Sequence, residues 1–311
     1  MKALPQRLFA AAVAALAFAA GGASAQTKIT VGYTGVSDFA GAFVAKEQEF
    51  FKKRGLDVEL QQLTLASIVP SALMSDSIQV GAITPPVFLQ AVDSKLPLVA
   101  IAGGSLTQKG LKNVAVVVRN GASIKTVQDL IGKKVGVPGL GATLHVLFRH
   151  WLRDQGVDHR KITFIEVPFP RMNDVIKGGS IDAAVAVDPF LGRMIQAATA
   201  APLSYFAEDL PDGLHATGYA TTSAWAKTNA VAVKAFREAL AEAAEFAKKD
   251  PVATRAAMGK YLKLPPPVLA SMAMPVLDAG LASKQLAFWI NTMNEQGLLK
   301  TQFDLDSLIV Q

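Results

Sequence analysis

The spacing of apolar residues divides the chain into short strands and amphipathic helices that alternate over most of its length. Residues 28–34 alternate between apolar and polar positions, which is typical of a strand buried on one side. The short apolar run at 135–137 favours a buried strand. Strands are predicted at residues 28–34, 57–61, 78–83, 96–102, 114–118, 135–137, 161–167, 181–187 and 216–222.

Helices are predicted between these strands, where apolar residues recur every three or four positions. The first helix begins at Ser37 or Asp38 and ends at Arg54, and its phenylalanines at 39, 43, 50 and 51 are spaced for one buried side. Strands that alternate with helices indicate an α/β fold. The predicted helices are 37–54, 67–75, one from 85, a turn from 126, 142–156, 170–177, 189–200, 231–249, one from 251, one from 265, 283–296 and 305–310.

Residues 133–156 (KKVGVPGLGATLHVLFRHWLRDQG) contain the most informative turn in the chain. A strand passes through Gly139 and Gly141 into a helix that begins at Ala142. Such a turn directs free backbone N–H groups and the positive end of the helix dipole at one point, and Thr143 adds a hydroxyl. The turn predicts half of a binding site for an anionic or strongly polar small molecule, with an ordinary strand-to-helix turn as the alternative.

The predicted elements fall into two similar halves. Residues 27–115 and 218–311 form lobe 1, and residues 116–217 form lobe 2, so the chain crosses between the lobes twice. The segment SIQVGA at 77–82 resembles SIDAAV at 180–185, and each is followed by a proline at a helix start. Facing strand ends in the two lobes would form a ligand cleft.

The first 25 residues have the pattern of a secretory signal peptide. Lys2 and Arg7 precede an apolar run at 8–20, and Ala23-Ser24-Ala25 is a small-residue cleavage site. The alternative, a membrane anchor, is disfavoured because the run is shorter than the ~20 residues of a spanning helix. We expect cleavage near Ala25 and a periplasmic mature protein.

Composition narrows the function further. The 311 residues are 51% hydrophobic and include no cysteine, which rules out cysteine nucleophiles, cysteine-ligated zinc and iron–sulfur clusters. Without the leader, 29 basic residues face 25 acidic ones, and the longest basic run is Lys52-Lys53-Arg54. A nucleic-acid surface is not expected, whereas the mild positive excess suits anionic solutes.

The histidines and glycines match no catalytic or cofactor motif. His145 and His150 are five positions apart, so they do not share a helix face as metal ligands. The pair Gly139 and Gly141 begins a dinucleotide fingerprint, but Leu144 occupies the third glycine position. We therefore predict no metal, no cofactor and no catalytic residues.

Candidate ligand contacts lie after predicted strands and at predicted helix starts. Asp38, Thr84 and Asp188 each have helix capping as an alternative role. Tyr219 lies on the return crossing, with burial in the hinge as its alternative, and His145 lies one turn into a helix. The candidates are Thr34, Ser37, Asp38, Thr84, Gly141, Ala142, Thr143, His145, Asp188 and Tyr219.

The order of short motifs along the chain resembles that of the periplasmic solute-binding proteins of nitrate/sulfonate/taurine-type ABC importers. The resemblance covers nearly all of the mature chain. The motifs are ITVGY at 29–33, GAITPPVF at 81–88, DLIGKKVGV at 129–137, GSIDAAVAVDPF at 179–190 and NEQGLL at 294–299.

The resemblance implies a two-lobed periplasmic-binding-protein fold of type II, with hinged and mostly parallel sheets. It implies a small anionic solute held between the lobes, delivery to an ABC permease in the inner membrane, and a monomer. The family's ligand contacts correspond to residues 34–38, Thr84, 141–143, Asp188 and the neighbourhood of Tyr219.

Two departures from the sulfonate binders make the predicted cleft less polar. The chain has Gly141-Ala142-Thr143 in place of a serine-rich helix start, and Ile83-Thr84 in place of an acidic residue before the prolines. We therefore expect an organic solute with a sulfonate or carboxylate group and an aromatic body as one option. The alternatives are a pyrimidine-forming or desulfinase-like enzyme on the same fold, or a receptor for another transporter or a sensor.

Overall fold

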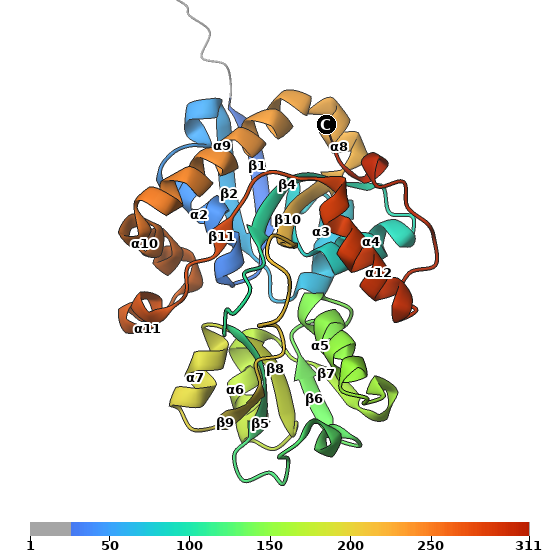
Figure 1. The fold of residues 1–311 in the computed structure, drawn as a ribbon. Helices are drawn as coiled ribbons and strands as arrows, with labels where there is room; N and C mark the ends of the chain where they lie inside the picture. Colours follow the sequence, from blue (N-terminus) through green and yellow to red (C-terminus); the bar gives the residue numbers. More distant parts are fainter. Residues whose placement is uncertain (1–25, 311) are drawn as a thin grey trace, which may run out of the picture.

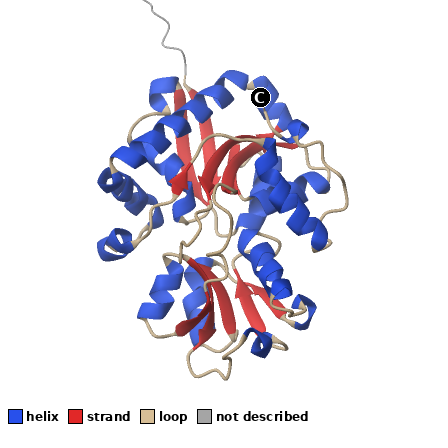
Figure 2. Cartoon of the chain, viewed as in Figure 1, coloured by secondary structure: helices blue, strands red, loops and turns tan. Residues whose placement is uncertain are grey.

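The computed structural model describes residues 26–310, and the predicted signal peptide at 1–25 lies outside this range. The described chain folds into two α/β halves, which Figure 1 shows one above the other. We call sheet A with its helices lobe A, and sheet B with its helices lobe B; Figure 2 shows the strands of each sheet surrounded by helices. Within residues 26–310, no helix combines the length and apolar character needed to cross a bilayer.

Sheet A has the strand order β11-β4-β10-β3-β1-β2. The strands β1, β2 and β3 are parallel, and β10 enters antiparallel between β3 and β4. The strands of this sheet are β1 (Thr27–Tyr33), β2 (Leu56–Gln62), β3 (Val80–Ile83), β4 (Leu98–Leu106), β10 (His215–Thr222) and β11 (Val276–Leu277).

Sheet B repeats this arrangement with the order β7-β6-β8-β5-β9. β6, β7 and β8 are parallel, and β5 pairs antiparallel with β8 as β10 does with β3. The similar segments 77–82 and 180–185 thus lead into equivalent central strands. The strands are β5 (Val114–Arg119), β6 (Lys134–Val137), β7 (Thr163–Glu166), β8 (Ala183–Val187) and β9 (Ala200–Ser204).

The helices bury apolar faces against the sheets and against one another. In lobe A, α2 packs on α9 and α10, and α4 packs on α12; in lobe B, α6 packs on α7. One hydrophobic cluster extends from lobe A into α5, and a second lies in lobe B beneath α6 and α7. The helices are α2 (Ala40–Glu47), α3 (Val69–Met74), α4 (Pro85–Asp93), α5 (Thr143–Asp154), α6 (Phe169–Lys177), α7 (Phe190–Gln196), α8 (Ser223–Thr228), α9 (Ala230–Lys249), α10 (Pro251–Leu262), α11 (Pro266–Ser271) and α12 (Ala287–Glu295).

The α/β prediction is confirmed, but each sheet is mixed because a crossing strand inserts antiparallel. The predicted helix over 37–54 is divided, since Glu49 has a left-handed φ of 59° and the helical turns 37–39 and 52–54 flank α2. The predicted helix over 305–310 is one turn, after which the Val310 amide donates to Ala100 O at 3.0 Å.

The predicted strand over 96–102 continues to Leu106 as β4 because Gly103 permits close approach of a second segment. The Gly103 amide donates to Ala279 O at 3.1 Å, and a Cβ at Gly103 would lie 2.1 Å from Gly280 O. The strands β9 and β11 and the helix α8 were not predicted; β11 has two residues, too short for a detectable alternation.

Candidate functional site

A pocket of about 160 Å³ lies between the two sheets and takes its lining from both lobes. In lobe A it begins where β1 and β3 end, at Thr34 and Thr84. In lobe B it is bounded by Pro138 after β6 and by Val187 at the end of β8. The carboxyl ends of parallel strands are the usual ligand site of α/β sheets. Six of the ten predicted contacts line this pocket: Thr34, Ser37, Asp38, Thr84, Ala142 and Thr143.

Asp38 carries the charge in the lobe A wall. It lies in the helical turn after β1, and its Oδ1 accepts a hydrogen bond of 2.8 Å from Ser105 Oγ of β4. Thr217 of β10 fixes Ser105, since Thr217 Oγ1 accepts from the Ser105 amide at 3.0 Å and lies 2.9 Å from Ser105 Oγ. The carboxylate is therefore held by two neighbouring strands of sheet A.

Among the described residues, no basic side chain balances this carboxylate. The residues that line the pocket, all within the described part of the chain, include no lysine, arginine or histidine. Asp38 also makes no ion pair within residues 26–310. Burial raises the pKa of Asp38 above its ordinary value, and the hydrogen bond from Ser105 only partly opposes this.

Thr84 joins β3 to α4 in an extended conformation, with φ −98° and ψ 149°. Its carbonyl accepts from the Phe88 amide, whereas its side chain does not cap the helix. Within the described residues, Thr84 Oγ1 is buried and has no hydrogen-bond partner. The hydroxyl is thus available to a ligand in the pocket.

The backbone amides of the turn before α5 were predicted to be free for a ligand, but three of them make hydrogen bonds within the protein. Leu140 N donates to Glu166 Oε2 at 3.2 Å, Gly141 N to His145 Nδ1 at 2.9 Å, and Ala142 N to Gly139 O at 3.1 Å. These three N–H groups are therefore occupied. Polar groups of α5 itself still face the pocket, because Thr143 lines it and its Oγ1 is buried without a partner among the described residues.

Gly141 and His145, both predicted contacts, support the turn and do not line the pocket. Gly141 has a φ of +75°, and its carbonyl accepts from Gln90 Nε2 of lobe A at 2.8 Å. His145 is only 7% exposed, and its ring lies against Phe164. Desolvation, with smaller effects of Arg149 and His159, lowers the pKa of His145 to about 3. It therefore accepts the Gly141 hydrogen bond as a neutral imidazole.

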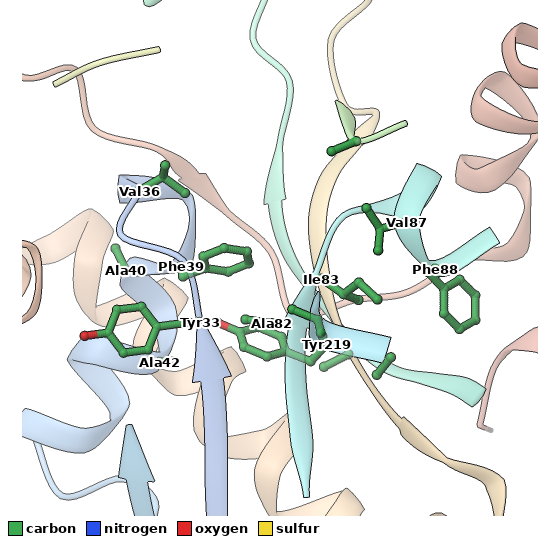
Figure 3. Packing of buried hydrophobic residues seen from close by; sticks show 14 of the residues in the cluster. Tyr33, Val36, Phe39, Ala40, Ala42, Ala82, Ile83, Val87, Phe88 and Tyr219 are labelled. Atoms are coloured by element: carbon green, nitrogen blue, oxygen red, sulfur yellow. The ribbon is translucent and has the colours of Figure 1, made fainter. Parts of the chain in front are cut away.

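Asp188 and Tyr219 also lie outside the pocket lining. Asp188 Oδ1 accepts from the Gly192 amide at 3.0 Å, which agrees with the alternative of a helix cap. Tyr219 is 1% exposed and packs edge-on against Phe39 and Phe236; Figure 3 shows it among the buried side chains near Phe39 and Ala82. Burial raises the pKa of the Tyr219 hydroxyl, in accord with the alternative of a buried hinge residue.

Several pocket residues were not predicted from sequence. Trp289 of α12 and Met274 before β11 reach the pocket from the C-terminal part of lobe A. Ser105 holds Asp38 without lining the pocket itself, and it lies beyond the predicted end of its strand at 102. Thr217 lines the pocket and lies within the predicted strand 216–222. The sequence does not single out Thr217, because Thr221 and Thr222 lie in the same strand. Within residues 26–310, no cluster of three or more acidic or histidine side chains could hold a metal ion.

Comparison with known proteins identifies relatives across most of the chain. A family model described as "NMT1/THI5 like" matches residues 36–254. A protein of Brucella abortus (strain 2308), named as a candidate binding protein, is 26% identical over 266 residues. The match covers 84% of this chain and 80% of that relative.

Two solved structures share the fold. The alkanesulfonate-binding protein SsuA from Xanthomonas axonopodis pv. citri, bound to MOPS, has a TM-score of 0.76 at 18% identity and covers 93% of this chain and 99% of its own. The periplasmic nitrate-binding protein NrtA from Synechocystis PCC 6803 has a TM-score of 0.73 at 16% identity, over 91% of this chain and 84% of its own. The two-lobed α/β architecture is thus that of these binding proteins.

Proposed function

The chain belongs to the NMT1/THI5-like family, and from this membership we propose that it is the solute-binding component of an ABC importer. It captures a small organic solute between its lobes, without chemical change, and delivers it to a permease in the inner membrane. The names of the two structural neighbours, which bind an alkanesulfonate and nitrate, support this proposal. The predicted leader at 1–25 supports a periplasmic location.

The observation that carries the proposal is a pocket walled by both lobes. Thr34 and Thr84 lie on one side, and Thr143 lies on the other. A solute that touches both walls only when the lobes are closed binds the closed form more tightly. It therefore shifts the population toward that form, which is the state a permease would distinguish.

One feature of the pocket, the start of α5, supports the more specific prediction that the solute carries a sulfonate or carboxylate group. Thr143 and Leu144, at the start of α5, line it, and helix N-termini favour negative groups. The pocket walls are otherwise largely apolar. We therefore propose an organic solute rather than a small inorganic anion, taken up by a protein that acts as a monomer.

Mass spectrometry of the natively purified protein tests the binding function. We expect one small molecule to co-purify at a stoichiometry near one and to be recovered unchanged after prolonged incubation. Ala66→Trp introduces a bulky ring at the pocket lining and should abolish co-purification of the molecule. Ala241→Trp, on the exposed side of α9, should leave co-purification unchanged. Conversion of the molecule to a product, or equal recovery from both variants, would contradict the proposal.

A further inference from the structure

Asp38 is a charged side chain in the pocket wall that lacks a charged partner within residues 26–310. We propose that the solute carries a positively charged nitrogen group with N–H donors, and that this group pairs with the Asp38 carboxylate. The inference rests on the proposed binding function and adds the chemical class of the solute. It holds whether or not the same solute also carries an acidic group.

The position of the carboxylate is fixed before any solute binds. Ser105 is fully buried and donates to Asp38 Oδ1 at 2.8 Å, while Thr217 Oγ1 holds Ser105 at 2.9 Å. Thr217 Oγ1 also lies 3.4 Å from the Asp38 carbonyl oxygen. β4 and β10, adjacent strands of sheet A, supply these two hydroxyls. A group held in this way is preorganised to recognise a ligand rather than free to turn toward solvent.

The side chains that line the pocket offer the Asp38 carboxylate no positive charge, so a cation that pairs with it comes from the solute. The Ser105 hydroxyl and the backbone amide of Asp38 itself occupy part of the acceptor capacity of the Asp38 carboxylate and leave the rest unused. The other polar lining side chains are hydroxyls and amides, including Thr34, Gln108 and Asn113, and none of them carries a positive charge. An ionised carboxylate that is removed from water without a cation is strongly disfavoured, and a cationic solute removes that penalty. A solute with only acidic groups would increase it.

The remaining walls set the size and character of the rest of the solute. Phe39, Leu106, Leu147 and Trp289 line the pocket together with other apolar side chains. Its volume of about 160 Å³ is close to the roughly 150 Å³ of a protein cavity that holds one benzene molecule. The geometry therefore fits a cationic nitrogen group on a body of about one six-membered ring.

Three probes of the same shape and different charge test this inference: benzamidinium, benzamide and benzoate. Isothermal titration calorimetry at pH 7.5 on the solute-free wild-type protein should show the tightest binding for benzamidinium, weaker binding for benzamide and the weakest binding for benzoate. We expect benzamidinium to bind at least about tenfold more tightly than benzoate, because only the cation completes a buried charge pair.

Two variants assign the preference to Asp38. Asp38→Asn keeps an oxygen acceptor for Ser105 and removes the charge, and it should weaken benzamidinium binding at least about tenfold while leaving benzamide binding nearly unchanged. Asp57→Asn neutralises an exposed carboxylate on β2 and should leave all three affinities unchanged. Circular dichroism checks that each variant is folded. If a variant does not fold, the three titrations of the wild-type protein still test the inference.

The outcomes separate this inference from the proposed function. Tighter binding of benzoate than of benzamidinium, or unchanged benzamidinium binding by Asp38→Asn, would overturn the inference. Benzoate binding that weakens with rising pH would also overturn it, since Asp38 would then donate as a neutral acid. A co-purified solute without an N–H cation would refute the inference and leave the proposed function intact. If no solute co-purifies and no probe binds, the proposed function itself fails.

Discussion

At the scale of single residues, the pocket is defined by polar groups that the fold leaves without partners. Thr84 Oγ1 and Thr143 Oγ1 are buried without a hydrogen bond inside the described chain, and Asp38 has one hydroxyl donor and no cation. Buried polar groups normally have hydrogen-bond partners, because a buried donor or acceptor without one loses its hydrogen bonds to water and gains none in return. The two unpaired hydroxyls and the uncompensated carboxylate lie around one pocket, where the proposed solute would complete their hydrogen bonds.

The raised pKa of Asp38 gives a prediction about stability and pH. In the unfolded chain this carboxyl has its ordinary pKa of 3.8, and burial raises the folded value. The folded protein therefore binds more protons between the two values, and its stability falls as pH rises through that window. We expect solute-free Asp38→Asn to have a higher melting temperature than wild type at pH 7.5, with the difference shrinking toward pH 4. A wild-type advantage at pH 7.5 would contradict the assignment.

At the scale of elements, the turn between β6 and α5 joins the lobes. Its amides bond within lobe B, and the Gly141 carbonyl accepts from Gln90 of α4 at 2.8 Å. The glycine is needed for two reasons: its φ is +75°, and a Cβ would lie 2.7 Å from Gln90 Oε1. The turn thus positions α5 against α4, which places Thr143 at the pocket.

Gly141→Ala should therefore destabilise the protein more than an alanine at a comparable glycine. The left-handed backbone costs an alanine about 1–2 kcal/mol, and loss of the Gln90 contact adds about 1 kcal/mol. Gly156→Ala is the matched control, since its φ is +72° and nothing lies within 4 Å of its added Cβ. Urea unfolding measures both; equal losses of unfolding free energy would mean that the contact between lobes contributes nothing.

At the scale of the whole molecule, hydrogen bonds cross between the lobes around the pocket. Ser67 of lobe A donates to Glu166 Oε1 of lobe B at 2.9 Å. On another side, Arg149 of α5 donates to Gln296 O at 3.2 Å, and Gln296 Nε2 donates to Val146 O at 2.8 Å. Under the proposed hinge motion these bonds break as the lobes separate, so each one contributes to the balance between closed and open forms.

Glu166→Ala should shift that balance toward the open form. Loss of the exposed hydrogen bond from Ser67, worth about 1 kcal/mol, changes the closed-to-open ratio about fivefold. The second bond lost, from the Leu140 amide, lies within lobe B and does not cross between the lobes. We expect small-angle X-ray scattering of the solute-free variant to give a larger radius of gyration than wild type. Glu59→Ala, which removes an exposed carboxylate on β2, should match wild type. An unchanged radius in Glu166→Ala would show that the Ser67 contact does not hold the lobes together.

The sequence by itself determined the elements and their class, because these depend on local spacing. The alternation at 28–34, the apolar run at 135–137 and the similar segments 77–82 and 180–185 predicted two α/β halves, and the structure has them with equivalent central strands. It also placed six of ten candidate residues at one pocket, since residues that follow parallel strands meet at the same sheet edge.

Only the tertiary structure decided which polar groups are free to meet a solute. The carboxylate of Asp38 depends on Ser105 and Thr217, which are 67 and 179 residues away along the chain. The amides of the glycine turn are taken by Glu166 and His145, and Tyr219 turns into the core. A hydrogen bond across the chain depends on the position of its partner in space, which local sequence patterns do not contain.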